Sequence, residues 1–390
     1  MKTAITGVEA AASRNSRIPR VLQIGKYYPP YMGGIETHLQ VLCEALQGDA
    51  HIDVVVAAGA AGHLNERVCG IPVERLSTWF TLASAPVCPA MISRIRRSPA
   101  DLIHIHLPNP IAVVAWLASG RRGPLVVTYH SDTVRQAFLG AAFDPIQQRM
   151  LGRAAAIIAT SPNYVATSQA LARHRDRCHV IPYGIPLAQF QFSTPEAVDQ
   201  LRRQYGDRLV LAVGRLVYYK GFENLIAAMR NVKARLLLAG DGPLRTKLQR
   251  LAAESGAGDR VVFLGEIQNG AIAPYYHAAS VFVVSSVARS EAFGIVQIEA
   301  MAAGKPVVNT RLDSGVPFVS LDQVTGLTVP PGDVGALAAA INRLLDDASL
   351  RARYGEAARA RAESEFSVEM MKSRILSLYR QVLAGKQAVL

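Results

Sequence analysis

The sequence has 390 residues, half of them apolar, and a formal net charge of +12 at pH 7. This length favours two domains over a single core, and the apolar content excludes a disordered chain. The four cysteines lie far apart and form no Cys-x-x-Cys pair, which argues against a cysteine zinc site or a disulfide framework and favours a reducing cytoplasm.

The first half of the chain alternates short apolar runs with segments of helical period. Residues 1–19 are expected to form a flexible leader, because they lack the apolar core of a secretory signal. Buried strands are then predicted at Val21–Gly25, Asp53–Ala57, Asp101–Ile105, Leu125–Thr128, Ala155–Thr160 and Cys178–Pro182. Alternation of this kind indicates a parallel sheet with helices on both faces, so a Rossmann-like domain is expected at residues 20–190.

The same alternation returns after a polar segment with two prolines, Ile185–Gly206. We expect a linker at 191–206, a second Rossmann-like domain at 207–365 and a C-terminal helix at 366–390. The strands of the second domain are predicted at Leu209–Val213, Ala234–Ala239, Val261–Leu264, Ser280–Val284 and Pro306–Asn309. The fold class is therefore α/β, with two doubly wound parallel sheets facing a central cleft, where ligands bind beyond the carboxyl ends of the strands.

Two charge-free stretches, Leu76–Ser93 and Leu102–Gly120, approach the length of a membrane span. Prolines and polar side chains in each argue against a span. Two readings stay open for Leu76–Met91, which contains Trp79 and Phe80: a packed core helix, or a surface that meets a lipid tail.

Basic residues are in excess in both halves of the chain, with clusters at Arg94, Arg96 and Arg97 and at Arg121 and Arg122. They could form solvated surface or attract anionic lipid headgroups or phosphorylated acceptors. Nucleic acid is not an expected partner, because no basic stripe is interleaved with aromatic residues.

Two loops of the first half carry candidate site residues. Gly33 and Gly34 open a predicted helix whose N–H groups could face an anion, although a simple helix-entry turn is the alternative. This loop is not the Gly-x-Gly-x-x-Gly of dinucleotide-binding proteins. His130 follows a predicted strand and could donate to a hydroxyl or phosphate, unless it is structural. His104 is expected in the core and His106 on a cleft loop.

Two loops of the second half bring together opposite charges. Arg215 and Lys220 lie five residues apart at a predicted helix start and suit a diphosphate, with a solvated loop as the alternative. Glu291 and Glu299 lie eight apart, the first expected in a loop and the second about two turns into the following helix, on roughly the same side. Carboxylates there would accept hydrogen bonds from sugar diols. Glu291 could instead be a partner of the helix dipole. No Asp-x-Asp motif is found, so no metal ion and no cofactor is expected.

This ordered set resembles the retaining GT-B glycosyltransferases of family 4, from about Val21 to Leu383. The match rests on Ser290–Glu299, Ala300–Val308, Gly214–Gly221 and Gly240–Pro243. The resemblance implies that His130, Glu291, Arg215 and Lys220 act in catalysis. It implies a donor site formed by Gly33, Gly34, Arg215, Lys220, Glu266, Ile267, Glu291, Phe293, Gly294, Ile295, Val296 and Glu299.

The resemblance also implies a reaction. A GDP- or UDP-linked hexose, mannose-type by the motifs Val127–Asp132 and Asp313–Leu327, would pass with retention to a glycan or lipid-linked acceptor held by the first domain. The expected setting is surface polysaccharide, lipopolysaccharide or glycolipid synthesis in the cytoplasm, with contact to the inner face of the plasma membrane as a hypothesis. A non-catalytic nucleotide-sugar-binding module and a sugar-nucleotide epimerase remain the alternatives.

Overall fold

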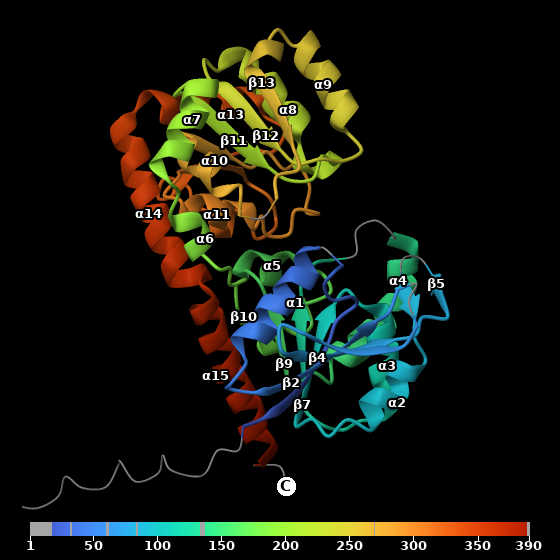
Figure 1. The fold of residues 1–390 in the computed structure, drawn as a ribbon. Coiled ribbons are helices and arrows are strands. Elements are labelled where there is room, and N and C mark those ends of the chain that lie inside the picture. The colour runs from blue at the N-terminus through green and yellow to red at the C-terminus, as the bar shows by residue number, and fades with distance from the viewer. Residues whose placement is uncertain are drawn as a thin grey trace, which may run out of the picture.

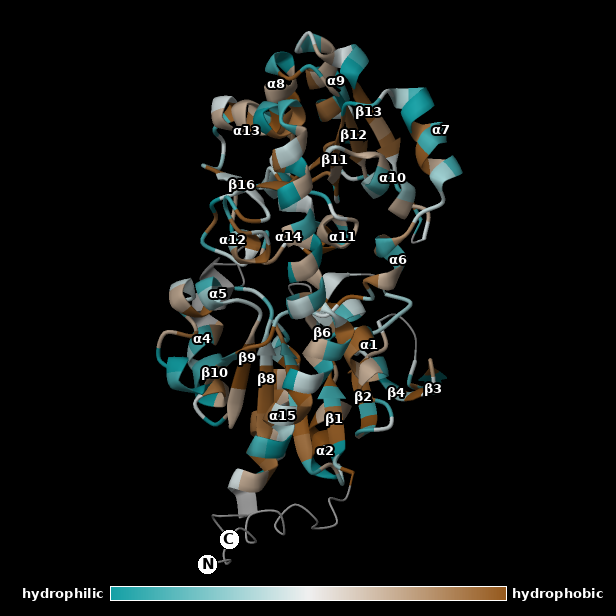
Figure 2. Ribbon diagram, turned by 90° about the vertical axis from the view of Figure 1, so that its left-hand side faces the viewer, coloured by the Kyte–Doolittle hydropathy of each residue, from teal (hydrophilic) through white to brown (hydrophobic). Residues whose placement is uncertain are grey.

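The computed structural model describes residues 18–31, 33–59, 62–82, 85–132, 137–268 and 270–387. Only the last two residues of the expected leader fall within these ranges. Two α/β units are stacked one above the other, and a pair of long C-terminal helices runs down one side of both (Figure 1). The strands are mainly hydrophobic, and the outer helices carry hydrophilic residues (Figure 2). The expected fold of two doubly wound sheets is confirmed.

The first unit contains an eight-stranded sheet in the order β10-β9-β8-β7-β1-β2-β4-β3. All neighbouring strands pair in parallel except β3, which runs antiparallel to β4. The strands are β1 (Arg20–Ile24), β2 (His51–Ala57), β3 (Leu64–Val68), β4 (Ile71–Leu76), β7 (Leu102–Leu107), β8 (Leu125–Tyr129), β9 (Ala156–Ala159) and β10 (Cys178–Val180).

Helices cover both faces of this sheet. One face packs against α2 (Ala90–Arg96), α3 (Pro110–Ser119) and α4 (Ala137–Leu151). The opposite face packs against α1 (Gly34–Ala45) and the last helix, α15 (Val368–Gln387). The shorter helices are α5 (Pro162–Thr167) and the 3-10 turn η1 (Arg175–Arg177).

The segment between β4 and α2 differs from the sequence expectation. Leu76–Met91 is not a packed core helix: it contains a two-stranded antiparallel hairpin of β5 (Phe80–Leu82) and β6 (Ala85–Val87). The hairpin leaves Trp79 and Phe80 exposed. Within the described ranges, no helix is long and apolar enough to cross a membrane.

The second unit contains a six-stranded, entirely parallel sheet in the order β13-β12-β11-β14-β15-β16. Its strands are β11 (Leu209–Val213), β12 (Arg235–Ala239), β13 (Val261–Gly265), β14 (Val281–Val283), β15 (Val307–Thr310) and β16 (Gly326–Val329). Its helices are α8 (Phe222–Ala228), α9 (Arg245–Glu254), α10 (Ala273–Ala278), α11 (Val296–Ala302), α12 (Val316–Val319) and α13 (Val334–Asp346), with 3-10 turns η2 (Tyr218–Lys220), η3 (Met229–Asn231) and η4 (Gly258–Arg260).

The connection between the units is helical in part. Residues 188–205 contain α6 (Ala188–Gln191) and α7 (Pro195–Tyr205), and Leu201 of α7 is buried in the core of the second unit. The segment expected as a linker therefore also contributes to packing.

The chain crosses between the units a second time near Ser367, where α14 (Ala348–Phe366) ends and α15 begins. The two crossings touch, because the N–H of Ile185 donates to the carbonyl of Phe366 at 2.9 Å. A Cβ on Gly184 would lie 2.8 Å from the carbonyl oxygen of Ser367, so only glycine permits this approach. As a result α14 packs on the second unit and α15 on the first (Figure 1).

Candidate functional site

Lys220 and Glu291 form a buried ion pair in the second unit. Lys220 follows β11 and Glu291 follows β14, and these strands are neighbours in the sheet. The Lys220 Nζ lies 2.6 Å from the Glu291 Oε2, with side chains only 12% and 9% exposed. The Ser286 hydroxyl donates to the same carboxylate oxygen at 3.0 Å. The structure therefore brings together two of the residues singled out in the sequence.

Two glycines hold Lys220 close to the sheet. Gly214 and Gly240 both have positive φ, +151° and +129°. A Cβ on Gly214 would lie 3.2 Å from the Lys220 Nζ, and a Cβ on Gly240 would collide with the carbonyl of Gly214. Larger residues at these positions would displace the loop that carries the ammonium group.

Arg215 is not part of this ion pair. Its side chain is exposed and makes no hydrogen bond or ion pair with another described residue. Burial raises the pKa of Tyr219, and the positive charges of Lys220 and Arg215 oppose that rise. Arg215 therefore lies near Tyr219, in the same loop as Lys220. Glu266 and Ile267, which the resemblance places in the donor site, follow β13; Glu266 is exposed and Ile267 is half-buried.

Glu299 lies in α11 and is bound by a tyrosine. The Tyr276 hydroxyl donates to the Glu299 Oε2 at 2.6 Å. Burial raises the pKa of Glu299 above 4.5, while the Tyr276 hydrogen bond and the charge of Lys220 oppose the rise. The positive charge of Lys220 therefore acts on both predicted glutamates, Glu291 and Glu299.

The loop at 285–295, which we call the Glu291 loop, contacts the first unit directly. Arg289 Nη2 lies 3.0 Å from Asp132 Oδ2, and its Nη1 donates to the Thr167 carbonyl at 3.2 Å. Phe293 is buried and meets the Tyr183 ring at 5.0 Å between centroids. Gly294, with φ of +72°, leads into α11. Ile295 and Val296 follow, both half-buried. Glu291 is therefore carried by a loop that contacts the first unit.

Gly33 and Gly34 start α1, as the sequence predicts. Gly33 is the N-cap in an extended conformation, and its carbonyl accepts from the N–H of Thr37 at 2.9 Å. A Cβ on Gly33 would collide with the carboxylate of Glu36, whereas a Cβ on Gly34 would meet nothing within 4 Å. Glu36 therefore folds back over the positive end of its own helix.

His130 is buried with both ring nitrogens engaged. Its Nε2 lies 3.0 Å from the Nδ1 of His106, and its Nδ1 lies 2.6 Å from the Tyr183 hydroxyl. Burial, reinforced by His38 and His104, holds the pKa of His130 well below 6.5, so the ring is neutral at pH 7. A direct contact from His130 to a ligand would require one of these bonds to open.

The sequence predicts different environments for His104 and His106, the two histidines of β7. His104 is fully buried, which confirms its expected place in the core. The expectation that His106 lies on a cleft loop is wrong: it is inside β7 and 1% exposed. The strand β7 extends two residues beyond its predicted end at Ile105, because buried polar side chains can form hydrogen bonds with one another on the covered face of the sheet.

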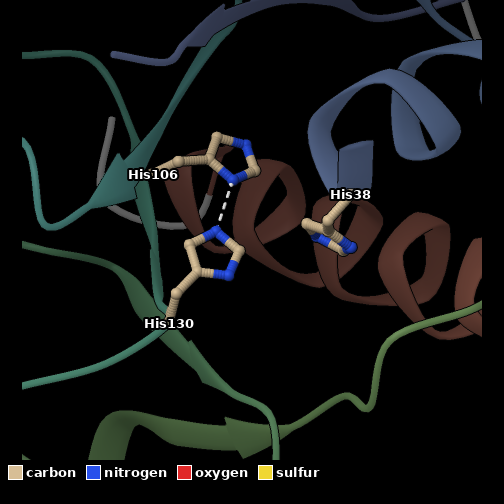
Figure 3. Close-up of side chains that lie close together, drawn as sticks. All are labelled: His38, His106 and His130. Atoms are coloured by element: carbon tan, nitrogen blue, oxygen red, sulfur yellow. Dashed lines mark hydrogen bonds between the residues drawn. The ribbon is translucent and has the colours of Figure 1, made fainter. Parts of the chain in front are cut away.

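His38 of α1 approaches His106 and His130, and the three rings converge (Figure 3). One nitrogen from each lies within 4.8 Å of the others, the spacing of a potential metal site. However, the nitrogens of His106 and His130 that face each other are hydrogen-bonded together. The arrangement is therefore first of all a hydrogen-bonded pair beside a third imidazole.

Several site residues carry no signal that sequence reasoning used. These are Gln23, Tyr183, Tyr276, Ser286 and Tyr379. Gln23 stands inside an apolar strand, and an isolated polar residue there is a usable sign of a buried hydrogen bond. The other four become visible only when distant segments are packed together.

Two cavities formed by described residues lie away from these side chains. One of about 560 Å³ lies beside the chain crossing and is lined by residues such as Glu44, Pro186 and Glu363. Another of about 650 Å³ lies at the amino ends of the first sheet, beside Arg122 and Arg153. Neither contains a predicted site residue, so the site rests on convergent side chains at the junction.

Comparisons with known proteins agree with the division of the chain into two units. Residues 33–184 match the family model "Glycosyl transferase 4-like domain", and residues 193–361 match "Glycosyl transferases group 1". The chain is 33% identical over 379 residues to O-antigen chain mannosyltransferase C of Escherichia coli, covering 94% of this chain and 100% of that protein. It is 31% identical to the D-rhamnosyltransferase WbpZ of Pseudomonas aeruginosa, covering 89% and 92%.

A solved structure, sucrose-phosphate synthase from Thermosynechococcus elongatus, superposes with a TM-score of 0.79 at 28% identity, covering 94% of this chain and 100% of that one. Fold, matched regions and full-length relatives point the same way. The chain is a glycosyltransferase, and it belongs to the GT-B glycosyltransferases of family 4.

Proposed function

We propose that this chain transfers a hexose, mannose-type, from a nucleotide diphosphate sugar to a glycan or lipid-linked acceptor in surface polysaccharide or glycolipid synthesis, with retention of anomeric configuration. The observation that carries the proposal is the buried Lys220–Glu291 pair at the junction of the two units. The names of two relatives, an O-antigen chain mannosyltransferase and a D-rhamnosyltransferase, support a hexose and a polysaccharide setting.

The two cations would act on the leaving group. As the bond between the sugar C1 and the phosphate oxygen breaks, Lys220 and the available donors of Arg215 would stabilise the departing diphosphate. This role needs no divalent metal and no cofactor. Glu291 and Glu299 would accept hydrogen bonds from donor sugar and ribose hydroxyls, respectively.

The remaining donor contacts follow the family resemblance. The backbone N–H groups of Phe293, Gly294, Ile295 and Val296 would meet sugar and phosphate, and the segment at Glu266 and Ile267 would meet the base. The start of α1 at Gly33 and Gly34 would approach the phosphates or sugar, provided that the Glu36 carboxylate swings away. The first unit would hold the acceptor.

The mechanism is tested by replacing Arg215 and Lys220 singly with Ala and measuring turnover in chelator. Removal of one stabilising group of this kind typically costs roughly 10²–10³ in rate. Full activity in either variant, or loss of wild-type activity on adding chelator, would refute the metal-free clamp. The anomeric configuration of the product, read by NMR, tests retention.

The donor and the competing functions are separated by ligand and product assays. Thermal shift against GDP- and UDP-sugars identifies the base, because a ligand that binds the folded state raises its melting temperature. Product formation from donor alone would favour an epimerase. Donor binding without turnover across an acceptor panel would favour a non-catalytic module.

Peripheral contact with an anionic membrane, on its cytoplasmic face, is part of the proposal. Trp79 and Phe80 are 74% and 56% exposed beside the β5–β6 hairpin, and aromatic side chains of this kind favour the membrane interface. Flotation with anionic liposomes should recover the wild type and lose a Trp79→Ser, Phe80→Ser variant. Phe192→Ser, at a 77% exposed aromatic outside the hairpin, is the matched control. No flotation of the wild type would remove membrane contact from the proposal.

A further inference from the structure

A hydrogen-bonded chain of buried side chains crosses the sheet of the first unit and ends at the domain junction. The histidine chain, as we call it, links residues of three strands (β1, β7 and β8), the segments that follow β8 and β10, and the last helix. Its members, in order, are Thr128, His104, Tyr379, Gln23, His106, His130 and Tyr183. Tyr379 packs in the core cluster between this sheet and α1 and α15, Tyr183 packs in the core cluster of the second unit, and all seven members are less than 9% exposed.

The Gln23 amide gives this chain a direction. Its Nε2 donates to the Tyr379 hydroxyl at 2.9 Å, and its Oε1 lies 3.0 Å from the His106 Nε2. A carbonyl oxygen only accepts, so His106 must carry its proton on Nε2 and leave Nδ1 bare. The His130 Nε2 must then donate to that bare nitrogen across 3.0 Å.

The same reasoning fixes the last bond of the chain. His130 is neutral, because burial lowers its pKa well below 6.5. With its one proton on Nε2, its Nδ1 is an acceptor and the Tyr183 hydroxyl is the donor at 2.6 Å. Turning the Gln23 amide through 180° would reverse every one of these protons, and Nδ1 would become a donor. The orientation of the Gln23 amide therefore decides whether the Nδ1 of His130 accepts or donates a hydrogen bond.

Tyr183 is the exchangeable end of the chain. Its ring meets Phe293 of the Glu291 loop at 5.0 Å, so movement of that loop acts directly on the tyrosine. If the Tyr183 hydroxyl turns away, His130 presents a lone pair at Nδ1. A lone pair suits the O–H of a sugar and repels the oxygen of a phosphate.

We infer that Gln23 and His106 are positioning residues that hold His130 in the Nε2–H tautomer, so that its Nδ1 accepts a hydrogen bond from a hydroxyl of the donor sugar. This inference rests on the proposed function for the identity of the ligand. The tautomer itself does not depend on that function. Gln23 would then discriminate between nucleotide sugar and nucleotide diphosphate without touching either.

The first experiment is imidazole ¹⁵N NMR on the wild type at pH 7, with His106 and His130 assigned from single His→Gln variants. Protonated and bare ring nitrogens have distinct shifts, so the tautomer is read directly. We expect both residues as Nε2–H with bare Nδ1. A bare Nε2 in either, a charged ring, or stoichiometric zinc bound by His38, His106 and His130 would overturn the inference.

The second experiment compares ligands by calorimetry, using GDP and GDP-mannose and then UDP and UDP-glucose. Gln23→Met should weaken the nucleotide sugar roughly tenfold, about one hydrogen bond, and leave the nucleotide diphosphate unchanged. Thr128→Val is the matched control, because it removes a bond at the far end of the chain and keeps both hydrogen bonds of Gln23. Equal weakening of both ligands in Gln23→Met would overturn the inference.

The two experiments separate the possible failures. If no nucleotide sugar binds the wild type, the proposed function fails while the NMR result still decides the tautomer. If Gln23→Met does not fold, the wild-type spectrum again decides it.

Discussion

Replacement of Lys220 by Met tests the energetic role of the buried pair at the domain junction. The two charged atoms are 2.6 Å apart, and the side chains are 12% and 9% exposed. Lys220→Met would leave the Glu291 carboxylate with the Ser286 hydroxyl as its remaining hydrogen-bond donor. Removing one partner of a buried ion pair costs about 3–5 kcal/mol, because the other charge stays buried and uncompensated.

The assay is urea unfolding at pH 7.5 of the wild type, both single variants and the double variant Lys220→Met, Glu291→Gln. The double variant should be more stable than Lys220→Met alone, since no charge is then left buried. Lys247→Met is the matched control: its pair with Glu223 is 3.4 Å long, with side chains 58% and 28% exposed. An exposed pair of this kind contributes about 0.2–1 kcal/mol.

Two results would refute this reasoning. One is a Lys220→Met variant no less stable than Lys247→Met. The other is additivity, in which the double variant loses the sum of the two single losses. Either would mean that the two charges do not depend on each other in the folded protein.

Three further predictions concern the framework of the site. Burial lowers the pKa of His38 and His104 to about 3, below the value near 6.5 expected in the unfolded chain. The free energy of unfolding should therefore be highest above pH 6.5 and fall toward pH 5, by up to about 1.4 kcal/mol per pH unit for each histidine. A free energy of unfolding that does not change with pH, measured by urea unfolding, would contradict this. Gly240→Ala should lower the melting temperature clearly more than Gly256→Ala. A Cβ at Gly240 would meet backbone atoms, whereas Gly256 faces open space. Equal changes in melting temperature, measured by calorimetry, would contradict this prediction. Arg289→Ala should loosen the contact between the two units and raise the radius of gyration in small-angle scattering. The charge swap Arg289→Asp, Asp132→Arg should restore the wild-type radius. An unchanged radius in Arg289→Ala would show that the 3.0 Å bridge does not hold the junction.

The central strands of both sheets could be predicted because they are buried on both faces. Such strands are continuous apolar runs, and the predicted Leu209–Val213 coincides with β11. The strands β3 and β4 could not be predicted in this way, although the edge strands β10 and β13 were, as Cys178–Pro182 and Val261–Leu264. β3 is mostly exposed and polar, and β4 includes Arg75, whose charge is hidden by a 2.6 Å bond to Glu66. The bond to Glu66 satisfies Arg75, a residue type that by itself argues against a buried strand.

The candidate site divides in the same way. Lys220 and Glu291 could be matched from the sequence because each follows a strand, and neighbouring parallel strands end at one edge. The surroundings of His130 could not. They depend on Tyr379, which is 275 residues from His104 in the chain and reaches it only because α15 crosses back. Polar contacts between distant segments leave no periodic trace in either one.

The resting arrangement constrains how a donor could enter. Lys220 already neutralises Glu291, so a diphosphate that takes the ammonium group leaves a buried carboxylate in need of new donors. On the proposed function, the hydroxyls of the donor sugar would supply them. A nucleotide diphosphate without its sugar would release Lys220 but leave Glu291 with Ser286. On the same proposal, the exchange of partners is favourable only when phosphate and sugar arrive together, so we expect selection for the intact donor in the second unit and contact with its sugar hydroxyl at His130 in the first.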